Sequence, residues 1–392
     1  MKPAADRRVA RAVQRVTATA LGPYQSAVVR IGFAATWLLF LLCELPNRHA
    51  LYGPDGPWSW DMGRELIADN NAFTVLLVSD STLWFEIVYG VCVLSSLLML
   101  LGWHTRAVSV VFMVGVLSLQ NRSIFVGDGG DNVVHLMAIY LVLTRCAQVW
   151  SLDARRAARN PGQDRVGPVL WAVLGVPLFV GTLLGRVGGD TWLIVLFWGL
   201  WISQGVWWAV NRCAPQSEPR TLLDVLANLA HNAALFVIMA EVCLIYATAG
   251  WYKIQGSRWQ DGTALYYPLK LSYFAPWPDL SALLASCGVM VMLLTYGTVV
   301  VQVAFPFTLL QRRVKNVLLA VMMLEHAAIA VLLGLPFFSL AMIAADAVFL
   351  PTALLVNLGA LVARRRNRLL PGRAVPPQLR RASEERHRTL VG

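Results

Sequence analysis

Charged side chains are scarce in this sequence. They make up 14% of its 392 residues, whereas apolar residues make up 57% and the mean hydropathy is +0.58. Soluble domains carry roughly a quarter charged residues, so the composition excludes a soluble globular protein and indicates an integral membrane protein. The formal net charge of +11 is then a signal of membrane topology, because Lys and Arg gather in cytoplasmic loops, and no nucleic-acid partner is predicted.

Several catalytic and metal-binding signatures are also missing. The six cysteines are dispersed, without a Cys-x-x-Cys pair or a Cys/His cluster at zinc spacing, and are interpreted as packing residues. The histidines form no i,i+4 pair of the kind that binds haem or zinc. The glycine-rich segment 127–131 lacks the Gly-Lys-Ser/Thr of a phosphate loop, and no Gly-x-Ser-x-Gly elbow accompanies it. Redox chemistry would therefore need a diffusible cofactor, and no metal site is predicted.

Long apolar runs recur along the chain. A helix needs about 20 apolar residues to cross a bilayer core of ~30 Å. The runs that approach this length lie at 26–44, 82–101, 105–119, 133–150, 167–185, 190–210, 225–250, 282–304, 314–334 and 337–360. The run at 105–119 is the shortest, and the last is interrupted by Asp346 and Pro351. The predicted fold is therefore all-α: a polytopic transmembrane helical bundle of about ten spans.

Lys and Arg between these runs predict the orientation of the bundle, because cytoplasmic loops carry an excess of them. With the N-terminus inside, the cytoplasmic loops hold Arg106, Arg145, Arg155, Arg156, Arg159, Arg165, Arg212, Arg220, Arg312, Arg313 and Lys315. The opposite loops hold Arg48, Arg64, Arg122, Arg186, Lys253, Arg258 and Lys270. We expect a multi-pass protein of the cell membrane with both termini in the cytoplasm.

One transmembrane domain is predicted to account for most of the chain, at residues 26–362. Residues 1–25 form a basic lead-in with three arginines on one helical face. This segment is either an amphipathic helix on the anionic inner leaflet or a disordered leader. Residues 363–392 are rich in Arg and also contain Pro, Ser and Glu, and they are predicted to form a disordered cytoplasmic tail.

Three connections on the predicted extracytoplasmic side are rich in turn-forming and aromatic residues. The first, 45–81, places prolines and glycines beside tryptophans, which favour the membrane interface. The second, 120–132, is a compact acidic turn whose Asp131 can cap the next helix and face His135 one turn later. The third, 251–280, carries several aromatic rings and is predicted to form a lid over the bundle.

Short motifs mark these connections and a later apolar run. A Tyr-Gly-x-x-Gly loop begins at Tyr52, and residues 121–131 read Asn-Arg, six residues, then Gly-Gly-Asp. Residues 249–262 read Ala-Gly-x-x-Lys, a short spacer, then Trp-x-x-Gly. A Glu-His pair at 325–326 precedes a Gly-Leu-Pro-Phe-Phe turn. In this order the motifs resemble the vitamin K-dependent γ-glutamyl carboxylases and their bacterial relatives, the horizontally transferred transmembrane (HTTM) domain family.

The resemblance covers roughly residues 26–356 and departs from the family at two points. Arg122 stands where the animal enzymes have histidine, and their large lumenal domain has no counterpart in this sequence. The resemblance implies that Lys253 is the base that deprotonates a reduced naphthoquinone of the menaquinol or vitamin K hydroquinone type. Oxygen and carbon dioxide would be the co-substrates. An amine acts as a base only when neutral, and desolvation favours that form.

The resemblance also implies the remaining site residues. His326 would act beside Lys253 as a contact to cofactor or substrate. The residues implied to shape the cofactor pocket are Asn121, Arg122, Asp131 and Trp259. Each assignment has a structural alternative: Lys253 can reach the headgroups as an anchor, and His326 can form an interhelical hydrogen bond. Arg122 is suited to bind a carboxylate, but it can equally pair with Asp131 and fix the turn.

The expected activity is hydroquinone- and oxygen-dependent proton abstraction, coupled to carboxylation of a peptide or a small-molecule carboxylate. The cavity would open to the extracytoplasmic side, and the partners would be the lipid bilayer, a quinone and that substrate. The alternative is a non-enzymatic membrane factor for the maturation or export of, or immunity to, a secreted peptide. A transporter ranks third, because the paired broken helices and inverted repeats typical of that class are not evident in the sequence.

Overall fold

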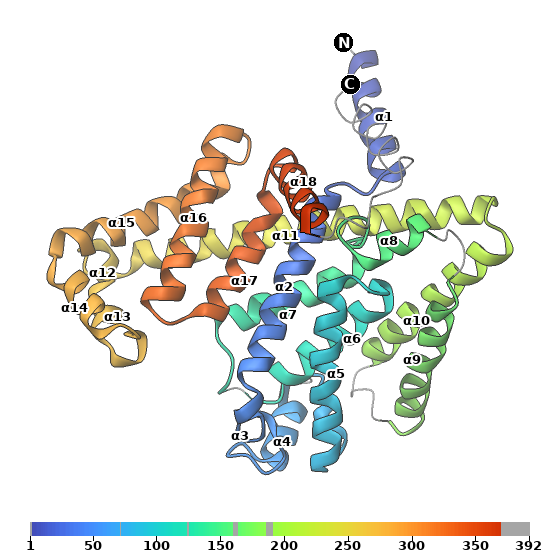
Figure 1. Cartoon of the computed structure of the whole chain (residues 1–392), viewed down its shortest axis with the longest axis horizontal. Helices are drawn as coiled ribbons and strands as arrows, with labels where there is room; N and C mark the ends of the chain where they lie inside the picture. Colours follow the sequence, from blue (N-terminus) through green and yellow to red (C-terminus); the bar gives the residue numbers. More distant parts are fainter. Residues whose placement is uncertain (1, 71, 124, 160–163, 186–190, 370–392) are drawn as a thin grey trace. The chain divides into compact units, whose positions relative to one another are not determined.

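The structure is a computed structural model that describes residues 2–70, 72–123, 125–159, 164–185 and 191–369 (Figure 1). Helices and short turns make up these residues, and no strand occurs among them. The predicted all-α class is therefore confirmed. The chain divides into two compact units, residues 1–349 and residues 350–392. Most of the predicted tail, from residue 370 onward, lies outside the described residues.

Seven of the described helices are long and apolar enough to cross a membrane. They are α2 (Pro23–Cys43), α5 (Thr82–Leu101), α9 (Val166–Leu183), α10 (Thr191–Cys213), α11 (Glu218–Gln255), α15 (Gly288–Ala304) with the adjoining turn η4 (Phe305–Thr308), and α16 (Arg312–Leu332). These helices make the chain a multi-pass membrane protein.

The other apolar helices fall short of a full span. α6 (Thr105–Gln120) has 16 residues and α7 (Gly129–Leu143) has 15, which correspond to helices of only about 23 Å. α17 (Pro336–Asp346) and α18 (Thr352–Leu369) pass the length requirement only when they are counted together as one interrupted span. The interruption follows Asp346, where the sequence also indicated a break.

Short helices occupy the N-terminus and the connections. α1 (Lys2–Ala18) precedes α2, so the lead-in is helical. The elements between α2 and α5 are η1 (Leu45–Asn47), α3 (Arg48–Tyr52), α4 (Trp60–Asn70) and η2 (Leu76–Val78). The elements in later connections are α8 (Leu152–Arg159), α12 (Ser257–Gln260), α13 (Tyr266–Lys270), η3 (Ser272–Phe274), α14 (Pro278–Ser286) and η5 (Ala347–Phe349).

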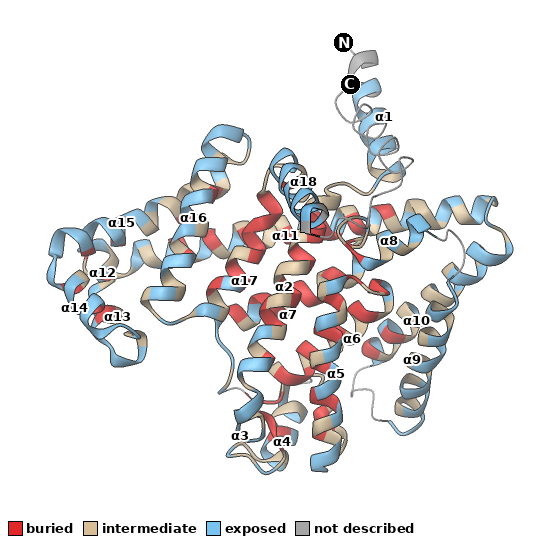
Figure 2. Ribbon diagram, viewed as in Figure 1, coloured by how far each residue is buried: buried red, intermediate tan, exposed pale blue. Residues whose placement is uncertain are grey.

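Helix α2 lies at the centre of the first unit. Its buried side chains Val29, Phe33, Trp37 and Leu41 recur every fourth residue, which places them on one helical face. Gly32 allows α17 to approach closely, because a Cβ atom there would lie 2.5 Å from the Cβ of Ala344. Close contact through small residues is the usual way in which helices pack in membranes. Figure 2 shows buried residues gathered on α2, α5, α6, α7 and α17.

A buried arginine on α2 fixes the end of α5. The guanidinium of Arg30 is fully buried and donates hydrogen bonds to four backbone carbonyls. The accepting residues are Met99, Leu100 (2.8 Å), Cys146 (3.3 Å) and Trp150 (2.9 Å). The last carbonyls of a helix have no partner within the helix. Arg30 therefore provides hydrogen-bond donors for the last carbonyls of α5, and its bonds to Cys146 and Trp150 connect the segment after α7 to the same place.

Helices α9 and α10 form a hairpin through a reciprocal tryptophan pair. The rings of Trp171 and Trp201 stack with centroids 4.1 Å apart. Each indole N–H donates to the other residue's carbonyl, at 2.8 Å from Trp171 and 2.9 Å from Trp201. A Cβ atom at Gly175 or Gly205 would lie 2.8 or 2.9 Å from the opposite indole, so both glycines provide the space for the rings.

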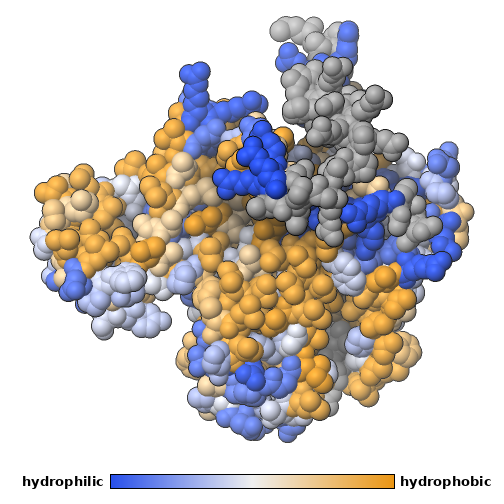
Figure 3. All heavy atoms as spheres, in the orientation of Figure 1, coloured by the Kyte–Doolittle hydropathy of each residue, from blue (hydrophilic) through white to orange (hydrophobic). Residues whose placement is uncertain are grey.

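The surface agrees with a bundle that is surrounded by lipid. Figure 3 shows apolar residues covering the face over α2 and α5, with hydrophilic residues gathered near the connection that contains α3 and α4. The α9–α10 hairpin exposes large aliphatic side chains, among them Val169, Val173 and Val195. An exposed apolar surface of this extent is a contact surface rather than a hydrated one.

The 38-residue helix α11 runs across the bundle (Figure 1). Near its start it holds the chain between α1 and α2. Asn228 donates to the carbonyl of Thr17 at 2.9 Å, and Asn232 donates to the carbonyl of Val16 at the same distance. His231 lies 2.7 Å from the carbonyl of Leu21. These polar residues of α11 therefore have a structural role.

The segment predicted to form a lid packs along α15. The hydroxyl of Tyr296 on α15 donates to the carbonyl of Gln260 at 2.8 Å. The amide of Leu265 donates to the hydroxyl of Thr295 at 3.4 Å. Gly262 has a positive φ of 76°, and a Cβ atom there would lie 3.2 Å from the ring of Tyr296. Contacts with α15 therefore help to order the segment.

Candidate functional site

Lys253 lies in the last turn of α11 and takes part in a polar chain across three helices. Its Nζ donates to Oε1 of Gln302 on α15 at 2.7 Å. Nε2 of Gln302 donates in turn to Oε1 of Glu325 on α16 at 2.8 Å. The amine also lies 5.2 Å from the centre of the Trp259 ring. The structure thus brings together two residues predicted for the site, Lys253 and Trp259.

Gly250, three residues before Lys253, explains how this series of hydrogen bonds forms. A Cβ atom at Gly250 would lie 2.6 Å from Cγ2 of Val303, so α11 and α15 approach each other at this point. Val303 directly follows Gln302, and the close approach brings the Gln302 amide within reach of the lysine. The small residue in the Ala-Gly-x-x-Lys motif therefore has a packing role that positions the amine.

His326 belongs to a second, more deeply buried cluster. Its Nε2 lies 3.0 Å from the hydroxyl of Tyr246 on α11, and that hydroxyl donates to Oδ2 of Asp346 on α17 at 3.1 Å. The three residues are at most 2% exposed. Tyr246 and Lys253 are seven residues apart, which places them on the same face of α11 two turns from each other.

The hydrogen bonds of Tyr246 determine which nitrogen of His326 carries a proton. A phenol has one proton, and here it goes to Asp346. The hydroxyl must then accept from Nε2–H of His326, which leaves Nδ1 as an acceptor. Nδ1 of His326 and Oδ1 of Asp346 are both buried without a hydrogen-bond partner among the described residues. Buried polar atoms are normally satisfied, so each of these two atoms can bind a polar ligand group or water.

The Asn121–Arg122 pair lies elsewhere and has structural contacts. Arg122 is 1% exposed and donates to the carbonyls of Gly53 at 2.9 Å and Trp58 at 3.0 Å. Asn121 donates to the carbonyl of Phe73 at 2.8 Å. Both residues therefore hold the connection between α2 and α5 in place. The structure does not bring them to Lys253, and Arg122 pairs with backbone carbonyls rather than with Asp131.

Asp131 completes a capping box at the start of α7. Oδ1 of Asp128 accepts from the amides of Gly130 (2.6 Å) and Asp131 (3.1 Å), and Oδ2 of Asp131 accepts from the amide of Asp128 at 2.8 Å. Such reciprocal bonds satisfy the first amides of a helix. The capping role predicted for Asp131 is present, whereas His135 lies against Gln120, with Nδ1 and Oε1 3.0 Å apart.

This turn nevertheless adjoins the His326 cluster through one aromatic residue. A Cβ atom at Gly130 would lie 2.6 Å from the Cα of Phe338 on α17. The ring of Phe338 in turn packs edge-on against His326, with centroids 5.6 Å apart. The order along the site is thus Asp131 turn, Phe338, His326 and Tyr246. Of the residues predicted to shape the pocket, the structure places the Asp131 turn near His326 and Trp259 near Lys253, whereas Asn121 and Arg122 hold the connection between α2 and α5.

Four residues of the polar clusters were not predicted as site residues: Tyr246, Gln302, Glu325 and Asp346. Asp346 was visible in the sequence as a charge inside an apolar run, where ionisable groups usually face the protein interior. Gln302 is likewise a polar residue in an apolar run. Tyr246 had a weaker signal, since tyrosine is common in membrane helices; its spacing of seven residues from Lys253 is the only indication.

A shallow apolar depression of about 400 Å³ lies along one face of α16, where Val317, Val321 and Leu324 line it. No group of three or more His, Cys, Asp or Glu side chains in the described part of the chain is placed to hold a metal ion.

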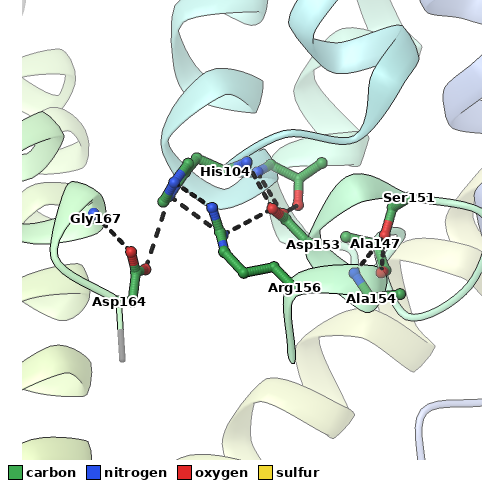
Figure 4. Close-up of polar contacts among 9 residues, drawn as sticks. His104, Ala147, Ser151, Asp153, Ala154, Arg156, Asp164 and Gly167 are labelled. Atoms are coloured by element: carbon green, nitrogen blue, oxygen red, sulfur yellow. Dashed lines mark hydrogen bonds and ion pairs between the residues drawn. The ribbon is translucent and has the colours of Figure 1, made fainter. Parts of the chain in front are cut away.

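A separate polar cluster fixes the connection between α5 and α6 (Figure 4). Oδ1 and Oδ2 of Asp153 accept from the amides of His104 at 2.7 Å and Thr105 at 2.8 Å. Arg156 donates to Nε2 of His104, and to Oδ1 of Asp153 at 2.9 Å. Nδ1 of His104 lies 3.8 Å from Oδ2 of Asp164. Asp153 thus supplies the N-terminal cap that α6 lacks in its own sequence.

His104 is neutral in this arrangement because Nε2 accepts from a guanidinium. Burial lowers the pKa of His104, and the charge of Arg156 lowers it further, against the opposing effects of Asp164 and Asp153. The residue also has a φ of 43°, a left-handed conformation that is uncommon for residues other than Gly, Asn, Asp and His. The cluster is a structural support for α6 rather than a site.

Comparison of the chain with protein-family models, with curated proteins and with solved structures finds no match in any of the three.

Proposed function

We propose that the chain is a multi-pass membrane enzyme of the vitamin K-dependent carboxylase type. The observation that carries the proposal is the environment of Lys253. Its amine is half-buried at the end of an apolar helix, and it is held by the uncharged amide of Gln302, with the carboxylate of Glu325 one hydrogen bond further away. An amide oxygen can accept from either an ammonium or a neutral amine, so this contact is compatible with a lysine that accepts a proton.

The proposed reaction is hydroquinone- and oxygen-dependent proton abstraction, coupled to carboxylation of a peptide or a small-molecule carboxylate. A reduced naphthoquinone, when bound, would provide a strong base through its reaction with oxygen. Lys253 would take the first proton, and Glu325, reached through Gln302, would favour the charged product. The unpartnered Nδ1 of His326 and Oδ1 of Asp346 fit the hydroxyl groups of such a cofactor. Trp259 would cover the amine, and Asp131 would support the pocket only through Phe338.

The proposal includes the topology that the sequence predicts. Ten spans result if α6, α7 and the α17–α18 pair cross the membrane together with the seven longer helices. Both termini would then be cytoplasmic, and Lys253 would open to the extracytoplasmic side beneath the segment α12–α14, which would act as a lid. The asymmetric distribution of Lys and Arg among the loops supports this orientation.

The proposal is tested with detergent-purified protein and a reduced menaquinone analogue. Lys253→Ala is expected to lower hydroquinone oxidation about 100- to 10,000-fold, the contribution of a positioned general base. Lys253→Arg should lower it similarly, because a guanidinium stays protonated. Lys270→Ala removes a lysine from α13 outside these clusters and is the matched control. Full activity of Lys253→Arg, with the parent melting temperature, would show that Lys253 is not the base.

A second candidate is a non-enzymatic membrane factor for the maturation or export of, or immunity to, a secreted peptide. The observation that favours it is the commitment of Asn121, Arg122 and Asp131 to backbone contacts, because residues that hold a turn are less available to a cofactor. Equilibrium binding of the quinone analogue separates the two candidates: the enzyme binds it and loses affinity in His326→Leu, whereas the factor does not bind it.

A further inference from the structure

Three arginines from three parts of the fold surround the indole ring of Trp207. Their guanidinium carbons lie 4.2 Å (Arg106), 4.9 Å (Arg220) and 6.0 Å (Arg145) from the ring centroid. Trp207 lies in the second half of α10, Arg106 in the first turn of α6, Arg220 in the first turn of α11 and Arg145 just after α7. Four helix ends therefore meet at one aromatic ring, and we call this group the Trp207 cluster.

The Trp207 cluster has more positive than negative charge. Asp224 forms ion pairs with Arg220 and, at 3.3 Å, with Arg145. Arg145 also donates to Oδ1 of Asn228 at 2.6 Å. Arg106 is exposed, and none of the ion pairs in the described part of the chain includes it. One carboxylate thus pairs with two of the three guanidinium groups, and the repulsion among the three is only partly offset.

We propose that the Trp207 cluster binds the phosphate of an anionic lipid headgroup. Guanidinium groups bind phosphate oxygens through paired N–H donors, and Arg106 has its donors free of ion pairs. Arg220, Arg145 and Asp224 keep 23%, 25% and 38% of their side-chain surface exposed, so a headgroup can reach them. Basic pockets between the ends of transmembrane helices are a common form of site for anionic lipids.

The surface beside the Trp207 cluster favours a lipid over a soluble phosphate. On α10, Ile202 and Val206 are 51% and 46% exposed, and on α11 Leu222 is 58% exposed. These side chains flank the cluster on the two helices that carry Trp207 and Arg220. An exposed aliphatic surface next to a phosphate site can bind acyl chains, which a soluble phosphate ester does not have. The inference is independent of the proposed carboxylase activity.

The test measures lipid retention by the detergent-purified full chain in native mass spectrometry. Short-chain phosphatidylglycerol is titrated against phosphatidylcholine of the same chain length, and the parent should prefer the anionic lipid. Arg106→Gln is expected to weaken phosphatidylglycerol binding about five-fold, the effect of one interfacial arginine. Arg155→Gln removes the same charge from an exposed position on α8 and should leave binding unchanged.

Two results would overturn the proposal. If Arg106→Gln and Arg155→Gln weaken binding equally, the preference reflects overall charge and no site exists at Trp207. If glycerol phosphate, which has no acyl chain, displaces the lipid at equal concentration, the ligand is a soluble phosphate. Arg106→Lys guards against a folding defect, because it keeps the charge but not the paired donors. It should bind with an affinity between those of the parent and Arg106→Gln.

Discussion

The hydroxyl of Tyr246 lies 3.0 Å from Nε2 of His326 and donates to Asp346 at 3.1 Å, so one phenol oxygen connects α11, α16 and α17. Tyr246→Phe removes both bonds and leaves two more buried polar atoms without a partner. We expect it to lower the free energy of unfolding by about 1–3 kcal/mol. Thermal unfolding of the purified variant in a fixed detergent measures this loss.

Asp346→Asn is the informative companion substitution. An asparagine keeps a carbonyl oxygen for the Tyr246 hydroxyl, so the loss should be clearly smaller than in Tyr246→Phe. Equal losses would indicate that the carboxyl group of Asp346, rather than its hydrogen bond to Tyr246, holds the cluster together. Phe338→Leu changes a neighbour without removing a polar group and controls for packing alone.

Arg122 provides a prediction that separates a structural residue from a cofactor ligand. Its two terminal nitrogens contact the backbone of residues 53–59. Arg122→Lys keeps the charge but offers one nitrogen in place of the planar fork, so it should cost about 1.5–3 kcal/mol of stability. The variant should keep any quinone affinity when it is measured below its melting temperature. A loss of quinone affinity at unchanged stability would instead show that Arg122 contacts the cofactor.

The pH dependence of stability should report on His104. Its pKa is lowered in the fold by burial and by Arg156, so the unfolded chain binds a proton more readily than the folded chain. The stability that neutral His104 contributes is complete above about pH 6.5, the ordinary value, and is lost as the pH falls below it. His104→Asn tolerates the left-handed backbone and should weaken the drop in melting temperature between pH 7.5 and 5.5. If the drop in melting temperature is unchanged in this variant, titratable groups other than His104 cause it.

Cysteine labelling tests the predicted topology. After the six native cysteines are replaced, single cysteines at Arg155 and at Gln260 should react with a membrane-impermeant reagent from opposite sides of sealed vesicles. The expectation rests on the opposite placement of these loops by the Lys and Arg distribution. Labelling of both from the same side would require a different number of spans between α8 and α12.

Truncation after Arg368 tests the predicted tail. Residues 369–392 contain few apolar side chains, too few to offset the entropy of ordering a segment. Yield and melting temperature should stay within the error of the full chain. A marked loss of folded protein would show that the tail docks on the transmembrane domain.

Hydrophobic length predicted where the helices lie, but their ends depended on contacts that the sequence does not reveal. The predicted run 133–150 ends as a helix at Leu143, and the turn after it binds Arg30. The run 282–304 is divided at Cys287 into α14 and α15. The run 225–250 is extended at both ends in the 38 residues of α11. Apolar composition fixes the middle of a membrane helix, whereas polar contacts from other elements fix its ends.

The candidate site could be predicted only in part. Lys253 and Trp259 follow each other closely in the chain, and a helix followed by a tight turn brings them together. The partners of His326 depend on how α11, α16 and α17 are rotated about their axes, which no local pattern determines. Arg122 illustrates the same limit: a guanidinium can bind either a carboxylate or several backbone carbonyls, and the folded path of residues 53–59 places three carbonyls around it.

The tryptophan pair of the α9–α10 hairpin has a consequence for assembly. Trp171 and Gly175 have the same spacing as Trp201 and Gly205, so each helix presents the ring that the other accommodates. Such an interface is isologous, like that of a two-fold dimer, although both halves belong to one chain. Either helix alone could pair with a copy of itself. The short link from residue 183 to residue 191 prevents this, because it gives the intramolecular partner a far higher effective concentration.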